Sequence, residues 1–364
     1  MTRGRKQWHL MVMILNFHFR WVNGAEQVPC YFIFGDSLFD SGNNNALPTK
    51  AKANYPPYGI DFPGGPTGRF SNGLNMADVI AQLLGFGGFI PSYASARGDD
   101  ILKGVNYASG GGGILNETAR NNLGFVWSMN HQLLNHQRTV SRIRRVLKRD
   151  RKSTAKYLSK CIYTVGMGNN DYINNYLLPQ FYTTSHVYTP EQYATVLVRQ
   201  YSRQLKILYK LGARKIAVFG LGLVGCTPGS VAIYGTSNSS MCVDSINMAV
   251  QIFNKKLIPL VDELNNNLQD AKFIYVDIFN ISSTPTPGNS AINTPCCEVG
   301  NLTMNEGVST CTPFGTSCPN RGEHVFWDTT HPTEVANAVL AGRSYSAQLP
   351  SDTYPIDIRR LAQL

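Results

Sequence analysis

The sequence predicts an α/β fold in which a central parallel sheet of about five strands is covered by helices on both faces. The first observation is a series of short apolar runs, near residues 30–34, 104–107, 161–165, 215–220 and 273–277. Such runs are typical of strands that are buried on both faces. The second observation is that helical periodicity fills most of the intervals between them. Strands that alternate with helices in this way form parallel sheets.

The helices are predicted from apolar side chains that recur three and four positions apart. Residues 75–84, 190–211 and 244–268 each show this spacing, which gathers the apolar side chains on one helical face. Residues 138–160 show it too, so one amphipathic helix is expected there.

Basic residues are concentrated in this last segment. Residues 138–160 hold ten Lys and Arg side chains against Asp150 alone, and residues 1–25 hold four more, whereas the formal net charge of the chain is only +10. A solvated helical face accounts for such a run. The alternative is weak contact with acidic cell-wall polymers or anionic lipid. Nucleic acid is not an expected partner, because no aromatic or nucleic-acid motif accompanies the charge.

The length of 364 residues, the 43% hydrophobic content and the absence of internal repeats predict a single domain over residues 26–364. Residues 1–25 are set apart from it. A basic start, a short apolar run at 10–15 and small or polar residues at 23–25 are features of a secretory signal peptide. Because the apolar run is short and Arg20 follows it, a disordered or wrongly assigned start of the chain is the alternative. The rest of the sequence contains no long apolar stretch, so no transmembrane segment is expected.

The cysteines and glycosylation sequons also indicate secretion. The chain has 8 cysteines, and their adjacent pair and wide gaps favour disulfides in an oxidising compartment over a metal site. The pairings stay open, and Cys161, inside an expected strand, is interpreted as a free thiol. Asn-x-Ser/Thr sequons occur at Asn116, Asn238, Asn280 and Asn301, which is weak further support for an extracellular glycoprotein.

Ser37 is the first candidate for chemistry. The apolar run 31–34 leads directly into Gly-Asp-Ser-Leu at 35–38, so Ser37 lies just beyond the carboxyl end of a core strand. Open α/β sheets place their ligand sites at that edge, and a serine held there on a rigid element suits a nucleophile. An ordinary turn after a strand is the alternative interpretation.

Two more groups of residues can complete such a site. Asp328 and His331 are three positions apart, so a tight turn can bring the carboxylate to one imidazole nitrogen and leave the other free to take a proton. The glycine run 110–113 and the segment 168–171, which contains Asn169 and Asn170, each follow a β-like run. Either could supply the N–H donors of an oxyanion hole at the same sheet edge.

Taken together and in this order, these stretches resemble the conserved blocks of the GDSL (SGNH-hydrolase) esterase/lipases, and specifically the plant branch. The four blocks are Gly-Asp-Ser-Leu at 35–38, the glycine block at 106–114, Gly-Asn-Asn-Asp at 168–171 and Asp-Thr-Thr-His-Pro at 328–332. Further plant-type signatures lie at 55–59, 68–73 and 225–228. The resemblance extends from about Cys30 to the C-terminus. It implies a three-layer, flavodoxin-like α/β/α architecture.

The resemblance also implies the roles of individual residues. Ser37 would be the nucleophile, His331 the general base, and Asp328 the residue that orients His331. The oxyanion donors would be the Ser37 amide, a glycine amide and the Asn170 side chain. The glycine is best matched by Gly111, with Gly110 as its neighbour. No metal and no organic cofactor would be needed.

Three functions remain open at this stage. The first is a secreted hydrolase of carboxylic esters, either an esterase or a lipase, that acts on a small-molecule or lipid ester. The second uses the same site in an acyltransferase or a deacetylase of cell-wall polysaccharide. The third is a catalytically silent binding protein, which the intact set of Ser37, Asn170, Asp328 and His331 disfavours.

Overall fold

The computed structural model describes residues 25–236, 241–284, 294–300 and 310–364, and the expected signal peptide therefore lies almost wholly outside the described residues. A six-stranded sheet has the order β2-β1-β3-β4-β5-β6. The strands are β1 Tyr31–Gly35, β2 Gly104–Asn106, β3 Ile162–Gly166, β4 Lys215–Phe219, β5 Lys272–Val276 and β6 Thr353–Tyr354. The first five are parallel, and β6 pairs antiparallel with β5.

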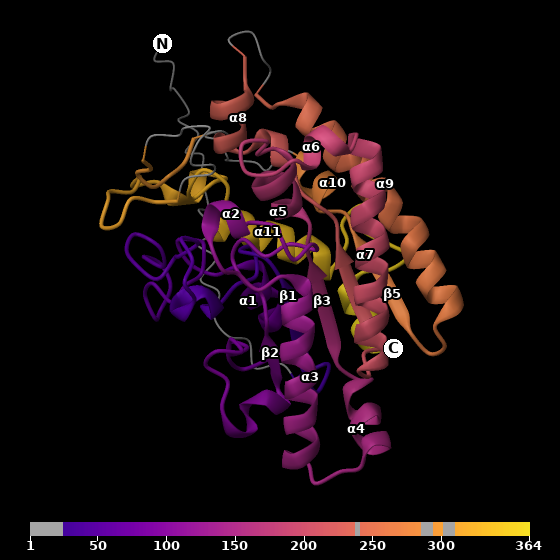
Figure 1. The fold of residues 1–364 in the computed structure, drawn as a ribbon. Coiled ribbons are helices and arrows are strands. Elements are labelled where there is room, and N and C mark those ends of the chain that lie inside the picture. The colour runs from indigo at the N-terminus through magenta and orange to yellow at the C-terminus, as the bar shows by residue number, and fades with distance from the viewer. Residues whose placement is uncertain (1–24, 237–240, 285–293, 301–309) are drawn as a thin grey trace, which may run out of the picture.

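The three-layer architecture is confirmed (Figure 1). One layer of helices consists of α3 Met129–Val146, α7 Pro190–Lys210 and α9 Asp244–Asn267, and the opposite layer consists of α1 Met76–Leu83, α11 Glu334–Tyr345 and α12 Ile358–Gln363. Alternate side chains of each strand pack against the two helical layers, because successive residues of a strand point to opposite faces of the sheet. The strand order 2-1-3-4-5 is that of flavodoxin-like folds.

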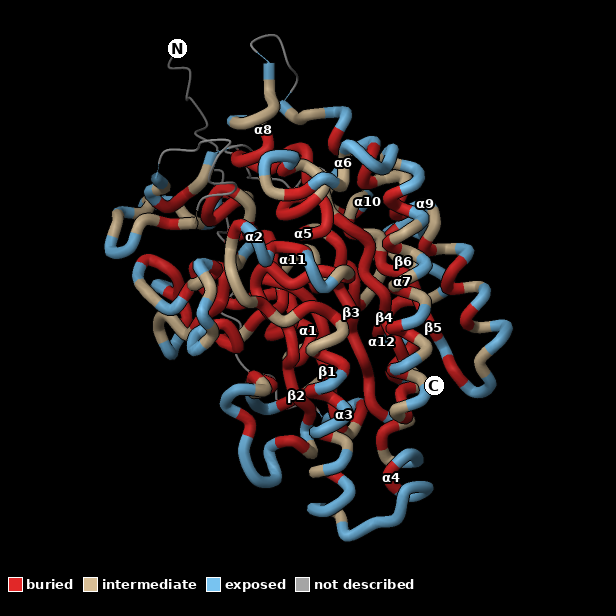
Figure 2. Tube along the Cα trace, in the orientation of Figure 1, coloured by how far each residue is buried: buried red, intermediate tan, exposed pale blue. Residues whose placement is uncertain are grey.

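The five parallel strands are buried over almost their whole length, as Figure 2 shows, whereas the short edge strand β6 is partly exposed. In β1 the side chains of Phe32 and Phe34 pack in the hydrophobic core on the side of helices α3, α7 and α9. Those of Tyr31 and Ile33 pack in the core on the side of helices α1, α11 and α12. This burial on both faces explains why the strands read as continuous apolar runs rather than as alternating ones.

The helices predicted at 75–84, 190–211 and 244–268 are confirmed within a residue at each end. The first two begin at capping boxes. Asn75 exchanges hydrogen bonds with Asp78, and Thr189 does so with Gln192. These reciprocal bonds satisfy N–H groups that a helix start leaves unpaired. Shorter elements complete the described chain: α2 Arg120–Leu123, α5 Asn169–Asp171, α6 Thr184–Val187, α8 Pro228–Tyr234, α10 Ile278–Ser283, η1 Asn43–Ala46, η2 Gly98–Leu102, η3 Tyr172–Tyr176, η4 Val224–Cys226 and η5 Arg321–Glu323.

The single helix predicted for 138–160 is wrong. Helix α3 starts earlier and ends at Val146, and a separate helix α4 covers Arg151–Leu158. Lys148 turns the chain with a left-handed φ of 47°. Asp150 then caps the new helix, because its carboxylate accepts the Ser153 amide at 2.7 Å. Arg144, Arg145, Lys148 and Arg149 around this turn are exposed, and the chain is coloured accordingly at the lower end of Figure 2.

All eight cysteines are paired, so the interpretation of Cys161 as a free thiol is wrong. The disulfides are Cys30–Cys161, Cys226–Cys242, Cys296–Cys318 and Cys297–Cys311. Cys30 and Cys161 immediately precede Tyr31 and Ile162, which are register partners in the neighbouring strands β1 and β3. Pairing of the strands therefore brings the two thiols together.

Candidate active site

Ser37 lies at the carboxyl edge of the sheet, directly after β1. The strand ends at Gly35, where an added Cβ would lie 2.8 Å from Cδ2 of Phe39 and 3.1 Å from the Gly166 carbonyl oxygen. Only glycine fits where the chain leaves the sheet this close to β3. Ser37 follows two residues later and lines a cavity, although only 9% of its surface is exposed.

The structure brings Ser37, His331 and Asp328 into one hydrogen-bonded chain. Nε2 of His331 lies 2.7 Å from Oγ of Ser37, and Nδ1 of His331 lies 2.7 Å from Oδ2 of Asp328. The other carboxylate oxygen, Oδ1, accepts the backbone amides of Thr330 and His331, both at 2.8 Å. This tight turn fixes the carboxylate relative to the imidazole, as the three-residue spacing predicts.

The electrostatics of this chain suit proton transfer. Burial of Asp328 would raise the pKa of its carboxyl, but the neighbouring His331 and the hydrogen bonds from His331 and Tyr58 outweigh burial and hold this pKa below its usual range. Asp328 is therefore a carboxylate at neutral pH. An imidazole whose Nδ1–H is bound to a carboxylate presents Nε2 as the proton acceptor toward the serine hydroxyl.

Three N–H donors line the same cavity. Ser37, Gly111 and Asn170 are lining residues, and they carry these groups on the backbone of Ser37, the backbone of Gly111 and the side chain of Asn170, of which one N–H donates to the Gly112 carbonyl. Within the described residues, the amides of Ser37 and Gly111 have no acceptor. The neighbouring glycine amides are occupied, since Gly110 donates to Oδ2 of Asp40 at 2.9 Å and Gly112 donates to the Ser109 carbonyl at 2.8 Å. The geometry thus favours Gly111 over Gly110 as a donor to a ligand.

A model of the GDSL-like lipase/acylhydrolase family matches residues 31–343. The chain belongs to the GDSL esterase/lipase family. Three GDSL esterase/lipases of Arabidopsis thaliana are similar over almost their whole length. One is 51% identical, with 98% of both chains covered, and another is 49% identical, with 99% of both covered. A third is 49% identical, with 98% of this chain and 99% of the relative covered. As a member of this family, the chain is a carboxylic ester hydrolase.

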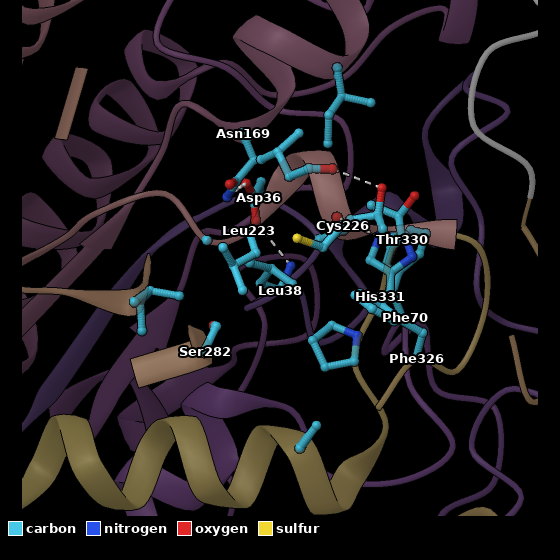
Figure 3. A pocket seen from close by; sticks show the side chains of 18 of the residues that line it. Asp36, Leu38, Phe70, Asn169, Leu223, Cys226, Ser282, Phe326, Thr330 and His331 are labelled. Atoms are coloured by element: carbon cyan, nitrogen blue, oxygen red, sulfur yellow. Dashed lines mark hydrogen bonds between the residues drawn. The ribbon is translucent and has the colours of Figure 1, made fainter. Parts of the chain in front are cut away.

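The cavity of this GDSL esterase/lipase is large and mainly apolar. Its volume is about 750 Å³. Figure 3 shows Ser282 of α10 and the helix α11 on one side of it and His331 with Phe70 on the other. The apolar lining residues include Leu38, Leu123, Ile173, Leu223, Val224, Ile278, Ile281, Phe326, Ala336, Val339 and Leu340. An apolar group attached to a carbonyl at Ser37 would find a matching environment here.

Two buried aspartates that sequence reasoning missed hold the glycine block in place. Asp40 accepts the amides of Gly42, Asn43 and Gly110, whereas Asp171 accepts those of Ile114 and Leu115 together with the Thr118 hydroxyl. Burial raises the pKa of each to about 6 against these hydrogen bonds. Asp171 follows Asn170 directly in the short helix α5. The helix therefore contacts the glycine block twice, through the Asp171 carboxylate and through the Asn170 side chain, which donates to the Gly112 carbonyl. The only sequence signal was that Asp171 lies inside one block of the family and Asp40 two residues after another.

Tyr58 and Asn169 were not predicted as site residues, but each contacts a carboxylate at the site. Tyr58, in the loop after the nucleophile block, donates a hydrogen bond to Oδ2 of Asp328 at 2.5 Å, and no sequence signal links the two. The resemblance implies Asn170 and not the adjacent Asn169 as a donor, and Asn169 donates to Oδ2 of Asp36 at 3.1 Å. Its amide nitrogen is therefore directed to a buried carboxylate.

Among the described residues, the one group with metal-ligand spacing is Cys296, Cys318 and His324. The two cysteines form a disulfide, so they offer no thiolate to a metal ion. In the part of the chain that the structure describes, no helix is long and apolar enough to cross a membrane.

Proposed function

We propose that this chain hydrolyses carboxylic esters through an acyl-enzyme on Ser37, with His331 as the general base. The observation that carries the proposal is the continuous chain of hydrogen bonds from Ser37 through His331 to Asp328 at the wall of the cavity. This arrangement matches the roles that nucleophilic acyl transfer requires.

The reaction would proceed in two halves. Nε2 of His331 takes the proton of Oγ as Ser37 bonds to the ester carbonyl carbon. The resulting oxyanion is stabilised by the amides of Ser37 and Gly111 and by Nδ2 of Asn170. Collapse of this intermediate breaks the bond to the alcohol oxygen, which receives the proton from His331. Water then attacks the acyl-enzyme with His331 as base, and Ser37 regains its proton as the acid is released.

We propose an ester with an apolar acyl or alcohol group of several carbons as the substrate. The support is the apolar lining on helices α10 and α11 and on the segment 222–226. Burying apolar surface contributes about 25 cal/mol per Å², so a longer chain gains binding free energy until the cavity is filled.

Hydrolysis of p-nitrophenyl acetate, butyrate and dodecanoate by the wild type and by Ser37→Ala tests the mechanism. The wild type should be active, and Ser37→Ala should lose about three powers of ten or more in kcat. Equal activity of the two proteins would exclude Ser37 as nucleophile. If both are folded and equally inactive, the same pair is assayed for acyl transfer and for deacetylation of acetylated polysaccharide, the two other reactions that the site could perform.

We also propose that the protein is secreted and glycosylated. The support is four disulfides together with the exposed positions of Asn116 and Asn280. The sequons at Asn238 and Asn301 lie outside the described residues. Mass spectrometry of protein collected from the medium of expressing plant cells gives the first residue and the glycan sites directly. A mature chain that still begins at Met1 would contradict cleavage of a signal peptide.

A further inference from the structure

The phenol of Tyr58 contacts the carboxylate of Asp328 in the interior of the protein. Tyr58 is 1% exposed, and its hydroxyl donates to Oδ2 of Asp328 at 2.5 Å. The same oxygen accepts Nδ1 of His331 at 2.7 Å. Asp328 thus has two donors on Oδ2, from Tyr58 and His331, and two backbone donors on Oδ1.

Tyr58 is itself held in place by a disulfide-bonded segment. Its hydroxyl oxygen accepts the amide of Cys311 at 3.2 Å, and Cys311 is bonded to Cys297. The amide of Cys297 donates to the carbonyl of Trp327 at 2.9 Å. Because Trp327 immediately precedes Asp328, the contacts form a closed circuit from Asp328 through Tyr58 and the disulfide back to Asp328.

Aromatic packing supports the same position. Tyr58, Phe70, Trp327, Cys297 and Cys311 belong to one buried cluster. The rings of Tyr58 and Phe70 meet edge-on with centroids 6.0 Å apart, and the ring of Phe70 lies 4.8 Å from that of His331. The Tyr58 ring therefore has little freedom to turn its hydroxyl away from Asp328.

We propose that Tyr58 is a positioning residue for ester hydrolysis, the fourth member of a hydrogen-bonded chain Ser37–His331–Asp328–Tyr58. The inference rests on the proposed roles of Ser37 and His331. Tyr58 holds the carboxylate plane so that Oδ2 stays aimed at Nδ1 of His331. It also shares the negative charge of Oδ2, which would otherwise act on the imidazole alone.

The phenol acts as a neutral donor and transfers no proton. Burial and the charge of Asp328 hold the pKa of Tyr58 well above its ordinary value, so the hydroxyl stays protonated throughout the working range. The titratable groups that face Asp328 are His331 and Tyr58, with Tyr55 behind Tyr58. Without the phenolic donor, the carboxylate attracts the imidazole proton more strongly, and the acidic limb of the activity profile moves to higher pH.

The experiment compares Tyr58→Phe with Tyr55→Phe in the full-length protein, using p-nitrophenyl butyrate between pH 4.5 and 9. Tyr55 is the matched control, because its hydroxyl contacts the Cys311 carbonyl and the Thr310 hydroxyl in the same loop but does not hydrogen-bond to Asp328. In Tyr58→Phe we expect kcat to fall about tenfold, KM to stay within about twofold, and the acidic limb of kcat/KM to rise by about half a pH unit. In Tyr55→Phe we expect an unchanged profile.

Two results would overturn the inference. One is a Tyr58→Phe enzyme with wild-type kcat and pH profile. The other is an equal loss in both variants with no shift of the profile, which would mean that the loop acts only through packing. The Ser37→Ala variant tests the proposed function separately from this inference. If it kept wild-type activity, Ser37 would not be the nucleophile, whatever the result for Tyr58→Phe.

If Tyr58→Phe does not fold, 3-fluorotyrosine placed at position 58 provides a second test. It keeps the ring and the hydroxyl but makes the phenol a stronger donor. The acidic limb should then move to lower pH than in the wild type, and an unchanged limb would exclude the role.

Discussion

Asn174 donates a hydrogen bond from its side-chain Nδ2 to Oδ1 of Asn170, over 2.7 Å. The contact fixes which end of the Asn170 amide faces the cavity. Nδ2 of Asn170 then donates to the Gly112 carbonyl at 3.1 Å, and its second N–H remains for a ligand. Asn174 is itself held by Asn122, whose Nδ2 donates to Oδ1 of Asn174 at 2.8 Å. A chain of three amides thus sets the orientation of one donor.

Replacing Asn170 by Ala should lower kcat by about 10²–10³, the usual loss when one oxyanion donor is removed. The KM should change little, because the donor acts mainly on the charge that develops in the transition state. Steady-state kinetics with p-nitrophenyl butyrate measure both constants.

The adjacent Asn169→Ala is the control for this substitution. Asn169 donates to the buried Asp36 rather than to the glycine block, so we expect a loss of about 1–2 kcal/mol in the free energy of unfolding and a much smaller change in kcat. Comparable losses of kcat in the two variants would argue against a specific role of Asn170.

Glu334 should make the protein less stable as the pH rises from about 4.5 to about 7. Burial, and then the charges of Asp61 and Asp78, raise its pKa to about 7 from 4.5, although a backbone hydrogen bond opposes the shift. A carboxyl whose pKa is raised on folding contributes stability below its unfolded pKa and loses it as the pH rises through the folded one. When the pH is raised from 5 to 8, the free energy of unfolding of Glu334→Gln should therefore improve by about 1–2 kcal/mol relative to that of the wild type.

Urea unfolding at the two pH values measures this gain. Glu191→Gln is the matched control, since Glu191 also lies in the first turn of a helix but is exposed. It reports any loss that comes only from removing a negative charge at a helix N-terminus. A Glu334→Gln protein with the same pH dependence as the wild type would contradict the raised pKa.

Narrowing the cavity should change selectivity for chain length. Leu340 of α11 lines the cavity, so Leu340→Trp should lower kcat/KM for p-nitrophenyl dodecanoate by about tenfold or more and leave that for the acetate within about threefold. Val335→Trp is the control, because Val335 lies on the same helix but is 41% exposed and outside the cavity lining. If Leu340→Trp lost kcat/KM equally for the acetate and the dodecanoate, the long acyl chain would not bind beside Leu340.

The basic surface around the α3–α4 turn should bind acidic polysaccharide weakly and in a salt-dependent way. Arg144, Arg145 and Lys148 are exposed there. Their joint replacement by Glu should abolish retention on a de-esterified pectin column at low ionic strength and leave ester hydrolysis unchanged. The control is the same replacement of Arg199, Arg203 and Lys210, which are exposed on α7. Equal loss in both proteins would indicate a response to net charge alone.

The fold was largely predictable because the central strands are buried on both faces and so stand out as apolar runs. Strand β6 was missed because it has only two residues, Thr353–Tyr354, at the sheet edge. The break between α3 and α4 contains neither glycine nor proline, so periodicity continues across it. The Asp150 cap was a usable signal there. The pairing of Cys30 with Cys161 required knowledge that β1 and β3 are neighbours.

The site was predictable only where its members form short motifs. Ser37, Asn170, Asp328 and His331 lie in such motifs. In the structure Ser37, Asn170 and His331 line one cavity, and Asp328 contacts His331 from the interior. Tyr58 is 270 residues from Asp328, and their contact depends on how a loop packs against a disulfide-bonded segment. A tyrosine in a Pro- and Gly-rich loop gives no sign of such a partner in its own sequence.

Ser37 and His331 are 294 residues apart, so the reaction centre joins the start of the described chain to a segment near its end. During synthesis the serine emerges from the ribosome long before its base. A product that terminates before residue 331 lacks the imidazole that contacts Oγ of Ser37. The hydrogen-bonded chain can therefore assemble only after the C-terminal segment that carries Asp328 and His331 has been made.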